Sequence, residues 1–299
     1  MGALISRGRS VPQYMPGEDQ SPAIPSMTRR QQAGPRSARS LLITVLGEYV
    51  LPHGEPVWTS TLLHVLGGLE IEEKSARQAL TRMAGTGWIH SERAGRRVRW
   101  ALTEPGRTLL REGAERIYSF GRERDSWDGR WLVLLVSIPE SRRELRHQLR
   151  NGLTWAGLGS PMPGVWISPH ASREAEAKQV VERLGLAPVV LSFCGPFAGI
   201  GSEQAMVEQA WHLGDLAGAY EDFVREFAGL RPEPGDDVLL AQIRLVHEWR
   251  RFPRLDPQLP LELLPPHWIG VRAAAAFTDL HQAWRDAALE RWAALVAED

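Results

Sequence analysis

The sequence predicts a multidomain α+β protein, and three observations lead to this fold class. Two helical patterns and a basic hairpin fill the first third, strands alternate with helices in the middle, and helical periodicity dominates the remainder. With 299 residues, 43% of them hydrophobic, the chain is long enough for several cores. We expect a tail at 1–36, followed by domains at 37–124, 125–195 and 196–299.

The first elements are a tail and a core helix. Residues 1–36 hold five prolines among glycine, serine, glutamine and arginine, without apolar periodicity, which predicts a disordered tail. From Ser40 to Leu51 the apolar residues share one helical face. This pattern predicts a helix that ends at Pro52.

Two further helices are expected around a short glycine turn. Trp58–Leu66 begins with hydroxyl residues that can cap a helix, and Gly67-Gly68 follow it. In the second helix, Glu73–Trp88, one face is apolar and the opposite face carries hydrogen-bond donors. The pair is typical of a helix-turn-helix.

A basic hairpin follows these helices. Ile89–Arg93 and Arg96–Leu102 alternate as strands do, and Ala94-Gly95 can join them. Between Lys74 and Arg99 stand seven basic residues and one acid, although the net charge of the protein is −1. Each piece alone also fits an amphipathic helix or an ordinary hairpin, but their order predicts a winged helix that binds DNA. The candidate DNA-binding residues are Lys74, Ser75, Arg77, Gln78, Thr81, Arg82, Arg93, Arg96, Arg97 and Arg99.

Charge, cysteine content and hydropathy restrict the function classes. Residues 1–126 carry 18 basic and 13 acidic side chains, a balance of +5, which leaves −6 for the rest and favours phosphate contact by the N-terminal part. Cys194 is the single cysteine, which excludes intrachain disulfides and cysteine-rich zinc sites, and we expect it in buried packing. The sequence has no run of about 18 apolar residues and no signal-peptide pattern, so we expect a cytoplasmic protein without a membrane partner.

The middle of the chain predicts a small ferredoxin-like domain. Its pattern is strand, helix, strand, helix, strand, with room for a fourth strand, and the first strand reads as buried on both faces. The expected strands are Trp131–Ile138, Val165–Ile167 and Val189–Phe193, with the fourth near Thr154–Leu158, and the expected helices are Ser141–Leu153 and Ser172–Leu184.

The last third predicts a mainly helical domain with a candidate effector site. Prolines interrupt Phe252–Trp268, between helical patterns on either side. Three donors share a helical face at i, i+3 and i+7, and neighbouring tryptophans can stack on a ring. The candidate effector-binding residues are Arg244, His247, Trp249, Arg250, Arg251 and Trp268. The alternative is a structural network that ties this helix to the proline-rich segment.

Three segments carry a family resemblance. They are SARQALTRMAGTGW (Ser75–Trp88), WDGRWLVLLVSIPESRRELRHQLR (Trp127–Arg150) with GVWISP (Gly164–Pro169), and RLVHEWRRFPRLDPQLPLELLPPHW (Arg244–Trp268). Over roughly 38–297 the chain resembles the PaaX-like bacterial transcriptional regulators, the phenylacetate-degradation repressors. The resemblance implies a homodimeric repressor that binds double-stranded operator DNA of an aromatic catabolic operon. An aryl-coenzyme A thioester, such as phenylacetyl-coenzyme A, would release it. We expect the central domain to connect the effector site to the DNA-binding helices.

Two alternative functions, an enzyme and an effector-independent DNA-binding protein, fit the sequence less well. The middle segment also resembles the ferredoxin-like nuclease subunit of CRISPR adaptation, but Ser137 stands where that group has a metal-binding aspartate, and a hydroxyl is a poor ligand for a hard cation. His247-Glu248 lacks the second histidine of a zinc protease, because Arg251 stands there. We therefore expect no enzyme, and no catalytic residue, metal or cofactor. An effector-independent DNA-binding protein is disfavoured by the large tryptophan-rich C-terminal half.

Overall fold

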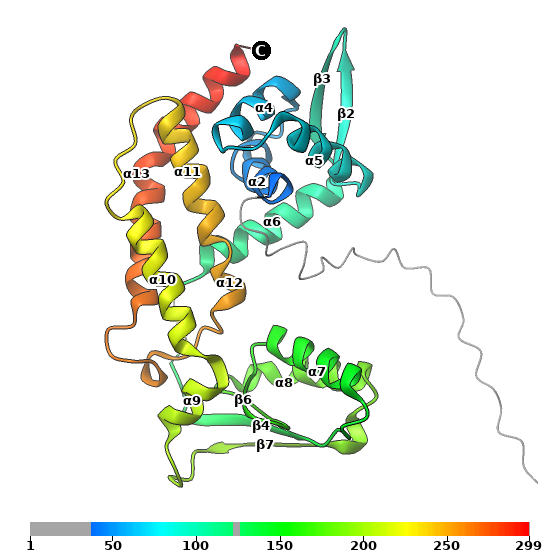
Figure 1. Ribbon diagram of the computed structural model, residues 1–299, viewed down its shortest axis with the longest axis vertical. Helices are drawn as coiled ribbons and strands as arrows, with labels where there is room; N and C mark the ends of the chain where they lie inside the picture. Colours follow the sequence, from blue (N-terminus) through cyan, green and yellow to red (C-terminus); the bar gives the residue numbers. More distant parts are fainter. Residues whose placement is uncertain (1–36, 122–125, 299) are drawn as a thin grey trace, which may run out of the picture. The chain divides into compact units, whose positions relative to one another are not determined.

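The computed structural model describes residues 37–121 and 126–298, in which helices pack beside two separate antiparallel sheets (Figure 1). The predicted tail at 1–36 lies outside the described residues. The mixed α+β class predicted from the sequence is confirmed.

The first helical stretch is longer than predicted. It consists of α2 (Ala38–Val45), a π-helical turn η1 (Leu46–Val50) and α3 (Leu51–His53), and it ends at Gly54 with a φ of +73°. The prediction that Pro52 ends the helix is wrong. Pro52 instead lies in the last turn of this stretch, just after the π-helical turn, and the helix continues for one more residue, to His53.

Apart from β1 (Val57–Trp58), which was not predicted, the next elements follow the predicted order. They are α4 (Thr59–Gly68), α5 (Glu73–Gly85), β2 (Ile89–Ala94) and β3 (Arg97–Leu102). The strands form an antiparallel sheet in the order β1-β3-β2. The predicted inner face of α5 is confirmed, since its buried residues are Ala76, Ala79, Leu80 and Met83.

Two local expectations about α4 are wrong. The Thr59 hydroxyl does not cap the helix; it donates to the Val98 carbonyl at 2.8 Å and accepts from Trp100 Nε1 at 3.0 Å. The turn after α4 places Glu70, not a glycine, at a positive φ of +64°. Gly68 instead permits close packing, because a Cβ there would lie 2.6 Å from Leu240 Cδ1.

The helix α6 (Glu104–Ser119) begins at a side-chain cap. The Thr103 hydroxyl accepts a hydrogen bond from the Gly106 N–H at 3.1 Å, which satisfies one free donor of the first turn. Gly106 lies against the turn between α5 and β2, because a Cβ there would lie 2.1 Å from the Trp88 carbonyl oxygen.

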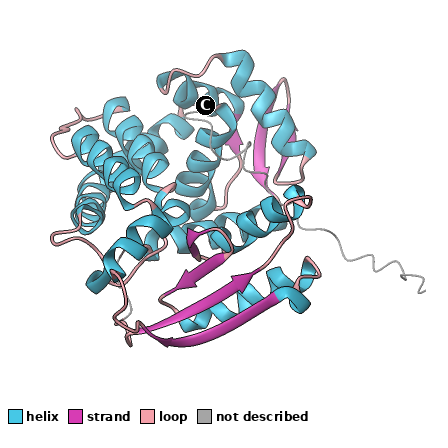
Figure 2. Ribbon diagram, turned by 60° about the horizontal axis from the view of Figure 1, so that its bottom comes forward, coloured by secondary structure: helices cyan, strands magenta, loops and turns pink. Residues whose placement is uncertain are grey.

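The middle of the chain forms a four-stranded antiparallel sheet with two helices on one face (Figure 2). The elements are β4 (Arg130–Val136), α7 (Arg143–Trp155), β5 (Gly159–Met162), β6 (Val165–Ser168), α8 (Glu174–Arg183) and β7 (Val190–Pro196). The strand order is β5-β6-β4-β7. Leu132 and Leu134 of β4 pack against Leu149 and Leu153 of α7 in one buried cluster.

Three predictions for this part need correction. The fourth strand lies at Gly159–Met162 instead of Thr154–Leu158, because α7 continues to Trp155 and the chain turns at Gly157 with a φ of +83°. The first strand is buried on both faces only near its start: Trp131 and Leu132 are buried, whereas Leu135, on the same face as Trp131, is 38% exposed. Cys194 is exposed on β7, an edge strand that pairs on one side only, and is not buried as predicted.

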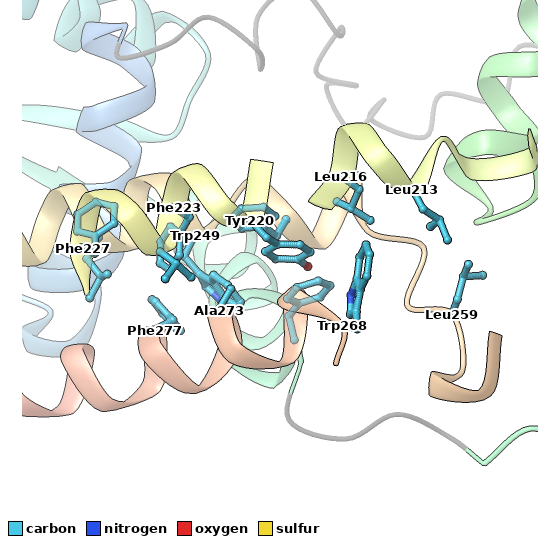
Figure 3. Packing of buried hydrophobic residues seen from close by; sticks show 14 of the residues in the cluster. Leu213, Leu216, Tyr220, Phe223, Phe227, Trp249, Leu259, Trp268, Ala273 and Phe277 are labelled. Carbon is cyan, nitrogen blue, oxygen red and sulfur yellow. The ribbon is translucent and has the colours of Figure 1, made fainter. Parts of the chain in front are cut away.

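The C-terminal part is helical, as predicted. It comprises α9 (Glu203–Trp211), α10 (Leu213–Phe227), α11 (Asp236–Trp249), α12 (Phe252–Leu255), the 3-10 turn η4 (Leu261–Leu263) and α13 (Ile269–Ala297). Aromatic side chains from α10, α11 and α13 form its core, and Figure 3 shows Trp249 among Phe223 and Phe277. Among the helices that the structure describes, none is both long and apolar enough to cross a membrane.

Candidate nucleic-acid interface

The outer face of α5 is a continuous row of hydrogen-bonding side chains. Lys74, Arg77, Gln78, Thr81 and Arg82 are exposed. Ser75, also predicted for this site, is half-buried and not fully exposed. This face is free to approach a ligand because the apolar residues on the opposite side of α5 anchor the helix in the core.

Arg77 and Thr81 already make weak local bonds. Arg77 Nε donates to Glu73 Oε1 at 2.8 Å, one turn away on the same helix. Both side chains of this pair are more than half exposed, and such a pair adds little stability, so Arg77 can exchange Glu73 for another acceptor. The Thr81 hydroxyl donates to the Arg77 carbonyl at 3.0 Å and keeps its lone pairs for a donor.

The hairpin beside α5 presents arginines at its tip. Ala94 and Arg97 face each other across the ladder, so Gly95 and Arg96 form a two-residue turn. Gly95 has a φ of +65°, as the hairpin turns that match strand twist require. Arg93 and Arg96 are exposed at this turn.

The other two hairpin arginines are held by neighbours. The Arg97 guanidinium lies 4.2 Å from the centre of the Trp58 ring, and its Nη2 donates to Ser60 Oγ at 3.4 Å. Arg99 Nε donates to Glu92 Oε2 at 2.8 Å across the strands. These contacts order Arg97 over the start of α4 and connect the hairpin to the helix pair. Sequence reasoning missed Trp58 and Ser60, although their position at the start of α4 is visible in the sequence.

The six predicted effector residues do not surround one open site. Trp249 is fully buried, and its ring stacks on Phe277 with centroids 4.7 Å apart. Trp268 is also buried, and its ring is nearly perpendicular to that of Tyr220, with the two centroids 6.1 Å apart. Neither ring has a free face for a ligand.

His247 and Arg250 bind α2, the first helix that the structure describes. His247 Nδ1 and Thr44 Oγ1 are 3.1 Å apart, and Arg250 Nη1 donates to Thr44 Oγ1 at 2.9 Å and to the Ser40 carbonyl at 2.8 Å. Burial, together with the nearby charge of Arg254, lowers the pKa of Arg250 to about 10, so Arg250 remains protonated at neutral pH. The structural network expected as the alternative exists: its hydrogen bonds tie α11 to α2, and the Trp249 ring packs against Phe252 of the proline-rich segment with centroids 5.2 Å apart.

Arg244 and Arg251 lie outside the core. Arg251 is 52% exposed and donates to Glu248 at 3.2 Å, while Arg244 is half-buried beside the Leu240 carbonyl. Arg244 and His247 line a cavity of about 30 Å³, which is far below the several hundred Å³ of a typical ligand pocket. As it stands, this cavity cannot hold a coenzyme.

Direct contacts join the C-terminal helices to the candidate DNA-binding elements. Arg291 of α13 donates to Asp236 of α11 at 2.6 Å, and Asp236 also pairs with His64 of α4 at 2.8 Å. The hydrogen bond from Arg291, followed by that from His64, lowers the pKa of Asp236. The Tyr49 ring of η1 stacks on Trp292 of α13 with centroids 4.9 Å apart.

A second polar contact links three segments of the chain. The Tyr118 hydroxyl of α6 donates to Glu48 of η1, and His281 of α13 lies 3.3 Å from both. Burial, together with the Glu48 charge, raises the pKa of Tyr118, which therefore stays protonated. A signal from the C-terminal helices can reach the helix pair through these contacts, without the route through the central part that the sequence led us to expect.

Comparisons with known proteins agree with this architecture. Three family models match in order: "PaaX-like protein" at residues 37–106, "PaaX protein central Cas2-like domain" at 124–207, and "PaaX-like protein C-terminal domain" at 211–294. The transcriptional repressor PaaX of Escherichia coli (strain K12) is 32% identical over 268 residues, covering 86% of this chain and 83% of that protein. The uncharacterized protein Rv0674 from Mycobacterium tuberculosis shares the fold, with a TM-score of 0.58, 22% identity, and coverage of 87% of this chain and 99% of the other.

Proposed function

Since this chain belongs to the PaaX-like protein family, we propose that it is a DNA-binding transcriptional repressor of the PaaX type. The observation that carries the proposal is the exposed donor face of α5 beside the arginine-tipped β2–β3 hairpin. The succession of helix, strand, two helices and hairpin supports a winged helix-turn-helix in residues 37–124. The strand order β5-β6-β4-β7 supports a ferredoxin-like domain in 125–195, followed by a helical regulatory domain in 196–299.

In this function the two elements have different tasks. Arginine and glutamine bind the edges of guanine and adenine in pairs of hydrogen bonds, so α5 reads the sequence in the major groove. The hairpin arginines bind phosphates, which position the protein and carry no sequence information. A homodimer would place two α5 helices on two half-sites one helical turn apart.

The proposal is tested by titrating the purified protein onto DNA from upstream of its own gene and of the adjacent genes. We expect one fragment to be bound in the presence of excess random DNA, because specific sites bind about 10³ to 10⁷ times more tightly than random DNA. Equal affinity for all fragments and for random DNA would refute the assignment as an operator-specific repressor.

Arg97→Ala is expected to weaken the binding of operator and random DNA by similar factors. Arg97 lies over the Trp58 ring on the hairpin, where it can meet a phosphate without reading a base. The slope of log K against log salt should decrease in magnitude by about one unit. Arg111→Ala, on the exposed side of α6, is the control and should leave the slope unchanged. A change in sequence preference with an unaltered slope would contradict this assignment.

We propose further that an aryl-coenzyme A thioester releases the protein from its operator, as the family resemblance implies. A ligand can release DNA only to the extent that it binds the DNA-incompetent arrangement more tightly. Of the predicted effector residues, Arg244 and Arg251 lie outside the core, so we place the phosphate contacts of the effector on them. The hydrogen bonds of α11 to α2 offer a direct path from these arginines to the DNA-binding helices.

Arg251→Ala is expected to leave operator binding intact and to raise the aryl-coenzyme A concentration needed for release. Fluorescence anisotropy of labelled operator DNA, titrated with a panel of acyl-coenzyme A compounds and free acids, measures both effects. Arg225→Ala is a matched control, because Arg225 is likewise exposed and bonded to an acid three residues away, Asp222, at 2.6 Å. If no acyl-coenzyme A compound binds or releases DNA, the effector part of the proposal fails.

The proposal assigns no reaction to this protein. Ser137 follows β4 directly, and its backbone N–H bonds the Val189 carbonyl at 3.3 Å. No carboxylate therefore stands at the position that corresponds to the metal-binding aspartate of the CRISPR nuclease subunit.

A further inference from the structure

The helix α7 carries a basic flank. With 100° per residue, its basic positions fall within a sector of about 140°. They are Arg142, which precedes the helix, and Arg143, Arg146, His147 and Arg150 within it. The other exposed positions of α7 hold Glu144, Gln148, Thr154 and Trp155, and Asn151 is half-buried, so the positive charge is confined to one side of the helix.

This flank points away from the neighbouring helix. Gly152 packs against α8, since a Cβ there would lie 2.5 Å from Val180 Cγ1. On the helix, Gly152 lies about 150° from the middle of the basic flank. Leu149 and Leu153 are buried against the sheet. The flank is therefore open to solvent, and all of its basic side chains except the half-buried Arg146 are exposed.

Acidic residues leave most of this charge uncompensated. Arg146 pairs with Glu140 at 3.6 Å, whereas Arg142, Arg143 and Arg150 have no acidic partner within 4.0 Å among the residues that the structure places. The adjacent helix α8 differs, because Lys178 pairs with Glu182 at 3.9 Å, and Arg173, just before α8, pairs with Glu176 at 3.1 Å. Both helices cover the same sheet, yet among the described residues three of the four arginines of the α7 flank lack an acidic partner, whereas in the α8 region only Arg183 does.

The arrangement on α7 opposes the local preferences of a helix. Like charges one turn apart destabilise a helix by roughly 0.2–0.5 kcal/mol per pair. Cations near its N-terminus are unfavourable, because the helix dipole is positive there. Residues 127–299 carry a net charge of −6, so acidic residues outnumber basic ones in this part of the chain. Violations of local rules that are not offset nearby are expected at functional surfaces.

We propose that the basic flank of α7 is a second DNA contact of this protein, one that binds the phosphate backbone outside the site read by α5. From Arg142 to Arg150 the helix rises about 12 Å, and one DNA strand presents a phosphate about every 3.4 Å along the axis. Three guanidinium groups can thus meet phosphates of one strand. Guanidinium suits this task because its planar donors match phosphate oxygens in pairs. The inference rests on the proposed function. This second contact adds affinity for DNA without sequence preference.

The test compares two triple variants of the full chain. Arg142→Gln/Arg143→Gln/Arg150→Gln removes the unpaired cations of α7, and Arg173→Gln/Lys178→Gln/Arg183→Gln removes three cations of the α8 region. The changes in net charge are equal, and glutamine has a helix propensity close to that of arginine and lysine. We expect the α7 variant to reduce the magnitude of the salt slope by about 2 to 3 units, for operator and random DNA alike. The α8 variant should change it by less than about one unit.

Each outcome decides the inference. A wild-type slope in the α7 variant, with operator binding still sensitive to substitution of Arg77, overturns this inference and leaves the proposed function standing. An equal loss in the α8 variant overturns it too, since net charge alone would then explain the effect. Loss of acyl-coenzyme A binding with an unchanged slope would assign the flank to the effector instead. If wild-type protein prefers no operator, the proposed function itself fails.

Arg150→Gln alone, with an expected change of about one unit in the salt slope, replaces the triple variant if circular dichroism shows that the latter is unfolded.

Discussion

Trp249→Ala is expected to lower the free energy of unfolding by about 3 to 5 kcal/mol, the cost of removing a fully buried tryptophan. The Trp249 ring lies at the centre of the aromatic core, stacked on Phe277 and 5.2 Å from Phe252 by ring centroids (Figure 3). Its indole N–H has no hydrogen-bond partner among the residues described, so the loss is one of packing. Because α11 also bonds α2, we expect the unfolding transition of the DNA-binding part to shift with it.

Urea denaturation followed by far-ultraviolet circular dichroism measures this change. Trp249→Phe should cost less, because it leaves a smaller cavity. Trp155→Ala is the matched control, since Trp155 is 53% exposed, and it should alter stability by no more than about 0.5 kcal/mol. A Trp249→Ala protein as stable as wild type, but unresponsive to acyl-coenzyme A, would refute the core assignment and restore the predicted ligand-stacking role.

Arg77→Ala is expected to weaken operator binding by about 1 to 3 kcal/mol, or about 5- to 150-fold in Kd. Arg77 lies in the middle of the exposed α5 face and is held only by a solvent-exposed pair with Glu73, so binding a base costs little local stability. Substitution removes a group that can bond two acceptors of one guanine. The loss should therefore fall mainly on operator DNA and relax the preference at a single base pair.

A mobility-shift titration against operator DNA and its single-base variants measures both effects. Arg111→Ala again serves as the control, because it removes the same charge from the exposed side of α6. Unchanged operator affinity in a folded Arg77→Ala protein would contradict the proposal that α5 reads the bases. A uniform loss on all DNA would assign Arg77 to the phosphate backbone instead.

Local sequence patterns determined most of the secondary structure. The buried face of α5, the hairpin between Ile89 and Leu102 and the cap at Thr103 all follow from rules that involve only residues a few positions apart. Periodicity specifies which side chains share a face, and the exposed row on α5 was predictable for that reason.

Where a segment ends was less predictable than what type it forms. The helix α7 continued to Trp155 and displaced the expected strand to Gly159–Met162, because the burial of Leu153 rewards another helical turn. The exposure of Cys194 depends on which strand lies at the sheet edge, and strand order is a long-range property.

Only the tertiary structure decided what the arginines and tryptophans of α11 do. The spacing of Arg244, His247 and Arg251 places them on neighbouring turns, but it does not say which other element covers that side of the helix. In the folded chain α2 lies there, more than 200 residues away in sequence, and the hydroxyl of Thr44 takes hydrogen bonds that a ligand was expected to take. Gly68 was likewise predicted to be a turn residue, but in the folded chain it packs closely against Leu240. Such pairings arise because distant faces must bury apolar area together and satisfy their polar groups in the same contact, and neither requirement leaves a periodic trace in the sequence.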